Sequence, residues 1–340
     1  MAARVGREHA PPRPPPPAPA LSERLDSDAV VVGGGPAGLA AATWLARYRR
    51  GVVVLDGGPP RSWATTLTHG YLGSDPVPPG ELLDRARSDL DAYPSASRRP
   101  VRATAVRQDG PGRFTVATDD GAQLTTRRLV LATGVEDELP PVQGIEEHYG
   151  ASAFHCPTCD GYEARDRRVV VLGWGAQVAG LALELMDWAA EVTMVTGGRR
   201  FEGDERHRRA LARHGVPLVE HEAAELVGPR GDLQAVCLAD GRELACDLVF
   251  FSVAHHPRTD LAVSLGCRLT DEGCLEADAE GRTSVDGVYG AGDITPGMQL
   301  VAVAVAKGTM AGVACALSLQ GEPAASAAPT PGPDAEAELP

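Results

Sequence analysis

The sequence predicts an α/β protein in which two similar strand–turn–helix units each begin a parallel sheet. The first unit has an apolar strand, 29–32, then the glycine-rich turn 33–38 and a segment rich in alanine and leucine. The second unit repeats this order with the strand 169–172 and the turn 173–178. Strands that alternate with helical segments are typical of βαβ units. A chain of 340 residues suits two or three domains.

The composition indicates a folded chain with an acidic surface. Hydrophobic residues make up 43% of the sequence, which supports sizeable cores. The formal net charge of −14 argues against a nucleic-acid partner, whose phosphates would be repelled. The seven cysteines cannot all pair within one chain, so we expect a reducing, cytoplasmic location with one working pair.

The two ends of the chain are expected to lie outside the folded domains. Residues 1–27 contain a proline-rich run without an apolar segment of signal-peptide length, which predicts a disordered arm. Residues 321–340, rich in Ala, Pro and Glu, predict a disordered tail. The apolar segment 300–319 is long enough to span a bilayer but carries Lys307 and many small residues. We interpret it as a buried helix and expect no membrane association.

The first turn has the spacing of a dinucleotide-binding fingerprint. Gly33, Gly35 and Gly38 form a G-x-G-x-x-G, and the next strand, 52–55, ends on Asp56. Asp56 lies 21 residues after Gly35, close to the roughly 20 expected for such a site. Gly33 permits the tight turn, Gly35 lets the backbone approach a pyrophosphate, and Gly38 lets helix and strand pack closely. The pyrophosphate would cap the helix N-terminus, and Asp56 would accept from ribose hydroxyls.

The chain after this unit predicts a loop, a helix over 79–93 and a small antiparallel meander. The strands of the meander are expected within residues 101–107, 113–118 and 127–131. In the loop, His69–Gly73 could approach a bound ligand, although a surface turn is the simpler interpretation. The last strand ends in Thr133 and Gly134, where small residues let a backbone lie against a cofactor.

A Cys-x-x-Cys pair followed by an acid lies between the two glycine-rich turns. Cys156 and Cys159, at this spacing near a βαβ pattern, indicate a redox pair that cycles between dithiol and disulfide. The attacking sulfur must be a thiolate, and this motif lowers a thiol pKa. His155 could assist as a neighbouring cation, and Asp160 could transfer a proton to or from a sulfur. The alternative, half of a structural zinc site, lacks a second Cys or His pair at ligand spacing, so no metal is expected.

The second glycine-rich turn predicts another nucleotide site, with differences from the first. Gly173 and Gly175 begin it, but Val178 stands at the third glycine position. The next strand ends without an acid and leads to Arg199 and Arg200. Basic residues there suit the 2′-phosphate of NADP, and the alternative is an exposed turn with two solvated arginines.

The last part of the chain is expected to return to the first unit. His255 and His256 precede a proline and are interpreted as structural rather than catalytic. A strand then runs into a small-residue turn that ends in Gly292 and Asp293. Asp293 could hold the ribityl chain of a flavin at the start of a helix from Gln299, or could simply cap that helix.

In this order, the motifs resemble the low-molecular-weight thioredoxin reductase family of flavoprotein disulfide reductases, over about residues 28–319. The resemblance implies two Rossmann-like, three-layer ββα nucleotide-binding domains, with an NAD(P) domain inserted in a discontinuous FAD domain. The implied boundaries are 28–138 and 263–320 for the FAD domain and 139–262 for the NAD(P) domain, which carries the redox pair.

The resemblance also implies cofactors, partners and roles. Cys159 would face the flavin, Cys156 would attack the partner's disulfide, and Asp160 would serve proton transfer. The implied cofactors are FAD and NADPH, with NADH possible. The implied substrate is a thioredoxin-like disulfide. The resemblance also implies a homodimer, and rotation of the domains about hinges near 135–141 and 256–261. The implied FAD contacts are Gly33, Gly35, Pro36, Ala37, Gly38, Asp56, Thr133, Gly134, Gly292, Asp293 and Gln299. The implied nicotinamide-nucleotide contacts are Gly173, Gly175, Arg199 and Arg200.

The chain departs from the pattern of the family at several positions. Thr196-Gly197-Gly198 stands where the family has His-Arg-Arg, and Met298-Gln299 replaces its Arg-Gln pair. These substitutions are similar to a divergent branch that includes dithiol oxidases, which close a disulfide in a small-molecule or peptide substrate and reduce oxygen. Those oxidases usually carry His after the second Cys, so Asp160 favours the reductase.

Overall fold

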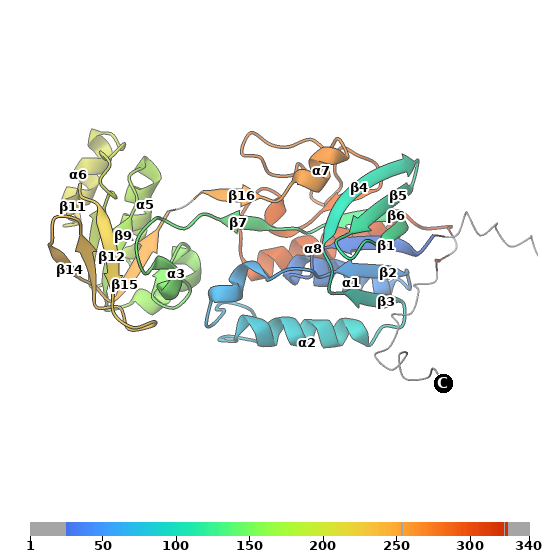
Figure 1. Cartoon of the computed structure of the whole chain (residues 1–340), viewed down its shortest axis with the longest axis horizontal. Helices are drawn as coiled ribbons and strands as arrows, with labels where there is room; N and C mark the ends of the chain where they lie inside the picture. The colour runs from blue at the N-terminus through green and yellow to red at the C-terminus, as the bar shows by residue number, and fades with distance from the viewer. Residues whose placement is uncertain (1–24, 253, 323, 326–340) are drawn as a thin grey trace, which may run out of the picture.

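The computed structural model describes residues 25–252, 254–322 and 324–325, which form two domains (Figure 1). The larger domain contains both ends of the described chain, and the smaller domain is inserted between them. The predictions of a disordered arm and tail fall mainly on 1–24 and 326–340, outside the described residues. The first strand begins at Ser27, one residue inside the segment expected to be the arm.

The larger domain is organised around one seven-stranded sheet. Its strands are β1 (Ser27–Val32), β2 (Val52–Leu55), β3 (Ala96–Arg99), β4 (Ala103–Gly110), β5 (Arg113–Thr118), β6 (Gln123–Leu131) and β17 (Val288–Gly290). The order is β3-β2-β1-β6-β5-β4, with β17 also paired to β6. β1 is parallel to β2 and β6, whereas β4, β5 and β6 form the expected antiparallel meander. The carboxyl ends of β1, β2 and β6 therefore meet at one edge, where such sheets bind ligands.

Two helices pack closely against each other beside this sheet. They are α1 (Pro36–Arg47) and α8 (Val301–Leu317). A third helix of this domain, α2 (Pro79–Asp91), lies between them in the sequence. A Cβ atom on Gly308 would lie 2.1 Å from the carbonyl oxygen of Ala37, so only glycine allows this approach. The interpretation of 300–319 as a buried helix is confirmed, because seven of the 17 residues of α8 are buried and Gly308 and Gly312 pack directly against α1. Within the described part of the chain, no helix has the length and apolar character needed to cross a membrane.

The inserted domain has three layers. Its parallel sheet contains β8 (Ala153–Phe154), β9 (Arg168–Leu172), β10 (Glu191–Val195), β11 (Leu218–Val219) and β15 (Leu248–Phe251), and the antiparallel sheet contains β12 (Ala223–Val227), β13 (Ala235–Leu238) and β14 (Glu243–Ala245). Val169 and Val171 of β9 pack on the side of α5 (Ala176–Leu185) and α6 (Glu205–Arg213). Val170 and Leu172 pack against the antiparallel sheet. This alternation gives the predicted ββα arrangement.

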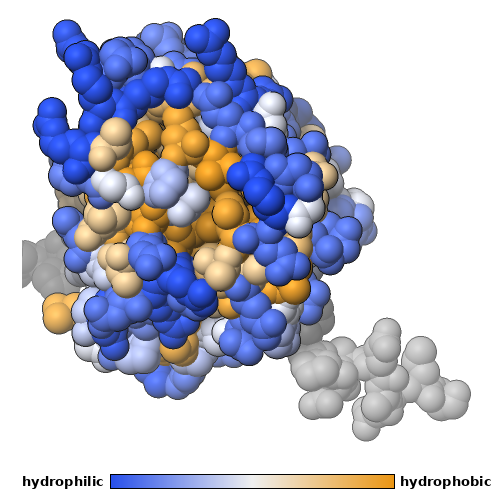
Figure 2. Space-filling model, turned by 90° about the vertical axis from the view of Figure 1, so that its left-hand side faces the viewer, coloured by the Kyte–Doolittle hydropathy of each residue, from blue (hydrophilic) through white to orange (hydrophobic). Residues whose placement is uncertain are grey.

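The outer end of the inserted domain exposes part of its apolar packing. Figure 2, which views this end, shows an apolar area surrounded by hydrophilic residues. Val219 and Leu244 are partly buried side chains that pack against the core beneath the antiparallel sheet. The core of this small domain therefore reaches close to its surface.

Two short strands connect the domains (Figure 1). β7 (Val135–Asp137) leads into the inserted domain, and β16 (His255–Pro257) leads back out. They pair antiparallel, with His255 opposite Asp137. The remaining short helices are η2 (Arg61–Ala64), α3 (Ile145–His148), α4 (Pro157–Asp160), η3 (Tyr162–Ala164), α7 (Asp260–Ser264) and η4 (Gly292–Ile294). The chain thus crosses between domains at the two places where hinges are expected.

Candidate active site

The first glycine-rich turn forms a cradle at the N-terminus of α1. Gly33 has φ of +114°, and a Cβ there would lie 2.3 Å from the carbonyl oxygen of Ala132. A Cβ on Gly38 would lie 1.8 Å from the carbonyl oxygen of Gly33. A Cβ on Gly35 would meet nothing within 4 Å, because this residue faces a cleft of about 490 Å³. Two glycines therefore serve packing, and the third leaves space for a ligand at the helix N-terminus.

Asp56 lies beside this turn and is held by an arginine that the sequence analysis missed. Its Oδ2 accepts hydrogen bonds from Arg87 Nε at 3.1 Å and Nη2 at 3.0 Å. Its Oδ1 lies 2.2 Å from the point where a Cβ on Gly34 would stand. The carboxylate is thus fixed against the turn. Arg87 lies in α2, 31 positions after Asp56, so no local sequence motif indicates the pair.

The other residues expected near this nucleotide divide into lining and packing residues. Thr133 lines the cleft, and its hydroxyl donates to the carbonyl of Arg258 at 2.7 Å. The carbonyl of Gly134 accepts from the amide of Arg258 at 3.0 Å. Pro36 is the first residue of α1. Ala37 is buried, and a Cβ on Gly292 would lie 2.7 Å from its Cβ, so Ala37 and Gly292 bring η4 close to the turn.

Arg61 is the second residue that the sequence analysis missed, and it joins the expected flavin contacts to the link between domains. Its Nη1 donates to Asp293 Oδ2 at 3.0 Å and to Gln299 Oε1 at 2.7 Å. Its Nε and Nη2 donate to both oxygens of Asp137 at 2.7 and 2.6 Å. The alternative that Asp293 caps a helix is wrong, because α8 begins at Val301 with Leu300 at its N-cap.

Asp137 is the anionic centre of this cluster. Burial alone would raise its pKa, but hydrogen bonds from His255 and Arg61 outweigh burial and hold the pKa well below its usual range. His255 Nδ1 lies 2.6 Å from Asp137 Oδ1. His256 lies 3.2 Å from the exposed carboxylate of Glu138. Both histidines are therefore engaged by acids of the paired link strand, as their structural interpretation expects.

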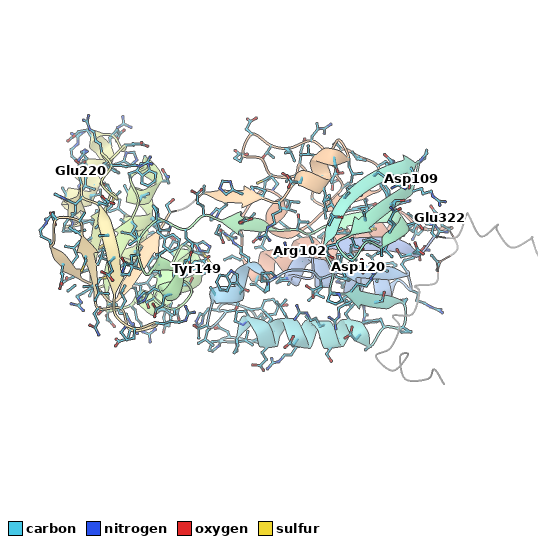
Figure 3. All side chains as sticks on the ribbon, viewed as in Figure 1. Arg102, Asp109, Asp120, Tyr149, Glu220 and Glu322 are labelled. Atoms are coloured by element: carbon cyan, nitrogen blue, oxygen red, sulfur yellow. A yellow bond between two sulfur atoms is a disulfide. The ribbon has the colours of Figure 1, made fainter. Side chains whose placement is uncertain are left out.

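His155 is a neutral residue in this setting, so the expectation that it acts as a neighbouring cation is wrong. Burial lowers its pKa to about 4, and the attraction of Asp137 does not offset this. Its Nε2 lies 3.3 Å from Arg61 Nη2, and its Nδ1 lies 3.2 Å from the hydroxyl of Tyr149. Figure 3 shows Tyr149 on the side of the inserted domain that faces the larger domain. The permanent cation beside Asp137 is Arg61, and its presence disfavours a second charge on His155.

The two cysteines form a disulfide at the start of the short helix α4. Cys156 is the N-cap of this helix, and its Sγ accepts from the amide of Cys159 at 3.1 Å. Asp160 follows directly. The pKa of Asp160 is raised to about 7, mainly by burial and to a smaller extent by the charge of Glu163. The nearby His69 has the opposite effect and lowers this pKa. Asp160 is therefore a carboxyl group that can hold or release a proton near neutral pH beside a disulfide.

The second glycine-rich turn is covered by its own side chains. A Cβ on Gly173 would lie 2.7 Å from Val178, and one on Gly175 would lie 2.3 Å from the carboxamide of Gln177. The guanidinium of Arg199 stacks 4.1 Å from the ring centre of Trp174. Arg199 thus lies beside the turn, at the shared carboxyl edge of the adjacent strands β9 and β10. Arg200 is exposed next to it.

Comparison with known proteins places this site in a family. Residues 27–308 match the family described as pyridine nucleotide-disulphide oxidoreductase. The thioredoxin reductase of Mycolicibacterium smegmatis is 31% identical over 87% of this chain and 95% of its own. A probable thioredoxin reductase of Arthroderma benhamiae is 39% identical over a shorter match, 46% of this chain and 40% of that one. The crystal structure of HlmI superposes with a TM-score of 0.82 and 36% identity, over 86% of this chain and 92% of that one.

The fold and the disulfide site together define a two-domain flavoprotein disulfide oxidoreductase. The chain belongs to the pyridine nucleotide-disulphide oxidoreductase family. Within this family it is a thioredoxin reductase-like, FAD-dependent enzyme, which confirms the resemblance given by its motifs. The family implies a flavin and a pyridine nucleotide, and the open cradle at Gly35 has the shape and the helix N-terminus that a dinucleotide requires.

Proposed function

We propose that this enzyme passes electrons from NADPH through FAD to the Cys156–Cys159 pair and on to a thioredoxin-like disulfide. The observation that carries the proposal is the Cys156–Cys159 disulfide with Asp160, a carboxyl group of pKa about 7, next to it. A disulfide reductase needs both an exchangeable cysteine pair and a nearby group that moves protons at neutral pH.

FAD is assigned to the cleft of the larger domain, which spans 28–138 and 263–320. The pyrophosphate fits over Gly35 at the start of α1, in the turn that Gly33 and Gly38 close and Pro36 and Ala37 continue. Asp56 would accept from the ribose, with Thr133 and Gly134 beside the cofactor. Asp293, behind Gly292, and Gln299 would bind toward the flavin end, where Arg61 already holds both. When bound, FAD supplies the two-electron chemistry that links nicotinamide to disulfide.

The inserted domain, 139–262, is assigned to the nicotinamide nucleotide. Gly173 and Gly175 would take the pyrophosphate after the flexible side chain of Gln177 moves aside. Arg199 and Arg200 supply positive charge at the end of the second strand, which supports NADPH over NADH. Arg199 would have to leave Trp174, or bind phosphate while stacked on it.

The cysteines are proposed to have different tasks. Cys156 attacks the partner's disulfide, and Cys159 then closes the internal disulfide and releases the partner's second thiol. Asp160 takes and returns the proton that these sulfurs exchange. We further propose a cytoplasmic homodimer. The location is supported by five other cysteines without a disulfide among the described residues, and the dimer only by the family resemblance.

The experiment that tests this proposal compares Cys156→Ser and Cys159→Ser, with Cys237→Ser, a partly buried cysteine of β13, as the control. We expect NADPH to reduce the flavin in all three variants. Only the control should then reduce thioredoxin, because each single cysteine cannot form the internal disulfide. Unchanged thioredoxin reduction by Cys159→Ser would overturn the proposal.

The covered second turn favours one other function, a dithiol oxidase. Gln177 over Gly175, Val178 at the third glycine position and the Arg199–Trp174 stack all reduce the space for a nicotinamide nucleotide. In an oxidase, a small dithiol would reduce the cysteine pair, and oxygen would take the electrons. Flavin reduction by a dithiol, with both nicotinamides inert, would support this second candidate.

A further inference from the structure

A line of titratable side chains leads from Asp160 toward the surface. Glu163 lies in η3, one turn after Asp160, and His69 reaches it from the larger domain. His69 Nε2 lies 3.7 Å from Glu163 Oε1, and His69 Nδ1 lies 3.2 Å from Asp75 Oδ1. The side chain of Asp75 is 50% exposed, whereas that of His69 is 23% exposed. The side chain of Glu163 is 33% exposed, so Asp75 is the most accessible group of the line and His69 and Glu163 are both partly shielded.

The position of His69 is fixed by its loop. Thr68 and Val77 exchange two backbone hydrogen bonds, which close the loop on either side of His69 and Asp75. The outcome for His69–Gly73 is accordingly a turn, as the simpler interpretation expected. The histidine at the start of that turn nevertheless approaches Glu163 of the inserted domain.

Glu163 carries an oxygen that lacks a partner. Its Oε2 is buried and accepts no hydrogen bond from the described residues, while its Oε1 faces His69. A buried carboxylate oxygen without a donor is costly, and a proton or a bridging water removes that cost. His69 Nε2, at 3.7 Å from Oε1, is within ion-pair distance of this carboxylate. Glu163 is thus placed to receive a proton from the His69 side.

Proton balance requires such a route. Reduction of one disulfide by NAD(P)H consumes one hydride and one proton and gives NAD(P)⁺ and two thiols. The hydride brings both electrons and one proton, so the second proton must come from solvent in every turnover. Asp160 is partly buried and has to be reloaded each time. This reasoning rests on the proposed function of Cys156, Cys159 and Asp160.

We propose that Glu163 and His69 form the path by which Asp160 exchanges its proton with solvent. An imidazole ring has two nitrogens that can exchange protons, and in His69 Nδ1 faces Asp75 and Nε2 faces Glu163, so the ring can pass a proton from one side to the other. Tyr149 also lies near Asp160, and burial and Asp137 raise its pKa, so its phenol keeps its proton. Because His69 and Glu163 belong to different domains, the path is complete only in the domain arrangement of this structure.

The test measures thioredoxin reduction from pH 6 to 9 in His69→Ala and Glu163→Gln. The matched control is His221→Asn, an exposed histidine of the inserted domain that pairs with Asp240. We expect both variants to lose roughly tenfold or more at pH 8 to 9, where protons are scarce, and less at pH 6. Added imidazole should restore His69→Ala, which a purely structural role would not allow. Flavin reduction by NADPH should stay unchanged in all three.

Two results would overturn the path. One is a pH profile like that of wild type in both variants, and the other is a loss in His69→Ala that is equal at every pH and not relieved by imidazole. In both cases the wild type still reduces thioredoxin, and the proposed function stands. If the wild type reduces no disulfide with either nicotinamide, the proposed function is wrong and the path falls with it.

Discussion

Asp160 shows how a single buried carboxyl group links function to stability. Its raised pKa means that the folded protein holds a proton between about pH 4 and pH 7, where the same group in the unfolded chain has lost it. The folded state therefore binds more protons than the unfolded state in this window, and stability falls as the pH rises through it. The group that suits proton transfer is stabilising only in its protonated form.

Replacing Asp160 with Asn should stabilise the protein at high pH while slowing disulfide reduction. Asparagine has nearly the same shape and no charge, so at pH 8 we expect a gain of about 1–3 kcal/mol in the free energy of unfolding. The gain should vanish near pH 4. Urea denaturation at a series of pH values measures it, with Asp187→Asn as an exposed control. A difference that does not depend on pH would contradict the raised pKa.

Arg61 should influence the protonation of His155. Its positive charge and that of His255 lower the pKa of His155, after the larger effect of burial. In Arg61→Met this charge is lost and Asp137 keeps its own, so the pKa of His155 should rise above about 4. Histidine NMR titration of the variant measures the shift. The loss of several hydrogen bonds should also cost about 1–3 kcal/mol of stability. An unchanged titration of His155 would contradict the network.

Residues with a chemical role were predictable from sequence where that role has a local pattern. The glycines of the first turn, Asp56, and the Cys156–Cys159 pair with Asp160 each stand in a short motif. Arg61, Arg87 and His69 do not. Arg61 meets Asp137 and Asp293 across 76 and 232 positions, contacts that only the folded chain creates. The wrong charge assigned to His155 has the same origin, because its pKa depends on these distant neighbours.

At the scale of elements, the first turn and α1 separate packing from binding. Gly38→Ala should destabilise the protein strongly, since its Cβ would lie 1.8 Å from a backbone oxygen. Gly35→Ala should fold normally, because its Cβ would meet open space, but should bind FAD at least tenfold more weakly because the methyl group enters the cradle. Thermal unfolding of the apoproteins and fluorescence titration with FAD measure the two effects. Normal FAD affinity in Gly35→Ala would contradict the assigned cradle.

Elements with strong hydrophobic patterns were the ones that the sequence predicted. The buried strands β1, β2 and β9 and the meander were found, although β6 begins at Gln123, four residues before the expected start. The antiparallel sheet β12–β14 was not anticipated from the residues, because its strands are only three to five residues long and two of them contain a glutamate. In the structure, β12–β14 cover the face of β9 that carries Val170 and Leu172, opposite the face that the helices cover.

At the scale of the whole molecule, the domains meet at the link strands and along residues 61–69 of the larger domain, where Ala64 packs into the core of the inserted domain and the amide of Thr66 donates to the carbonyl of Gly150 at 3.1 Å. Besides the paired strands β7 and β16, Arg61 bridges to Asp137, and His69 approaches Glu163. Arg230 of the inserted domain donates to the carbonyl of Ala64 in the larger one at 2.8 Å. The relative motion of domains that the proposed transfer between nicotinamide, flavin and cysteine pair requires would have to break these contacts and make them again. None of these contacts has a sequence motif, because each partner lies in a different domain.

The central claim is that electrons enter from a nicotinamide and leave to a disulfide. Anaerobic stopped-flow absorbance of the FAD-loaded protein tests it most directly, with NADPH, NADH and a small dithiol mixed in separate runs. We predict that NADPH bleaches the flavin and that oxidised thioredoxin restores the colour. Bleaching by the dithiol alone, with both nicotinamides inert and oxygen restoring the colour, would contradict the reductase and establish a dithiol oxidase.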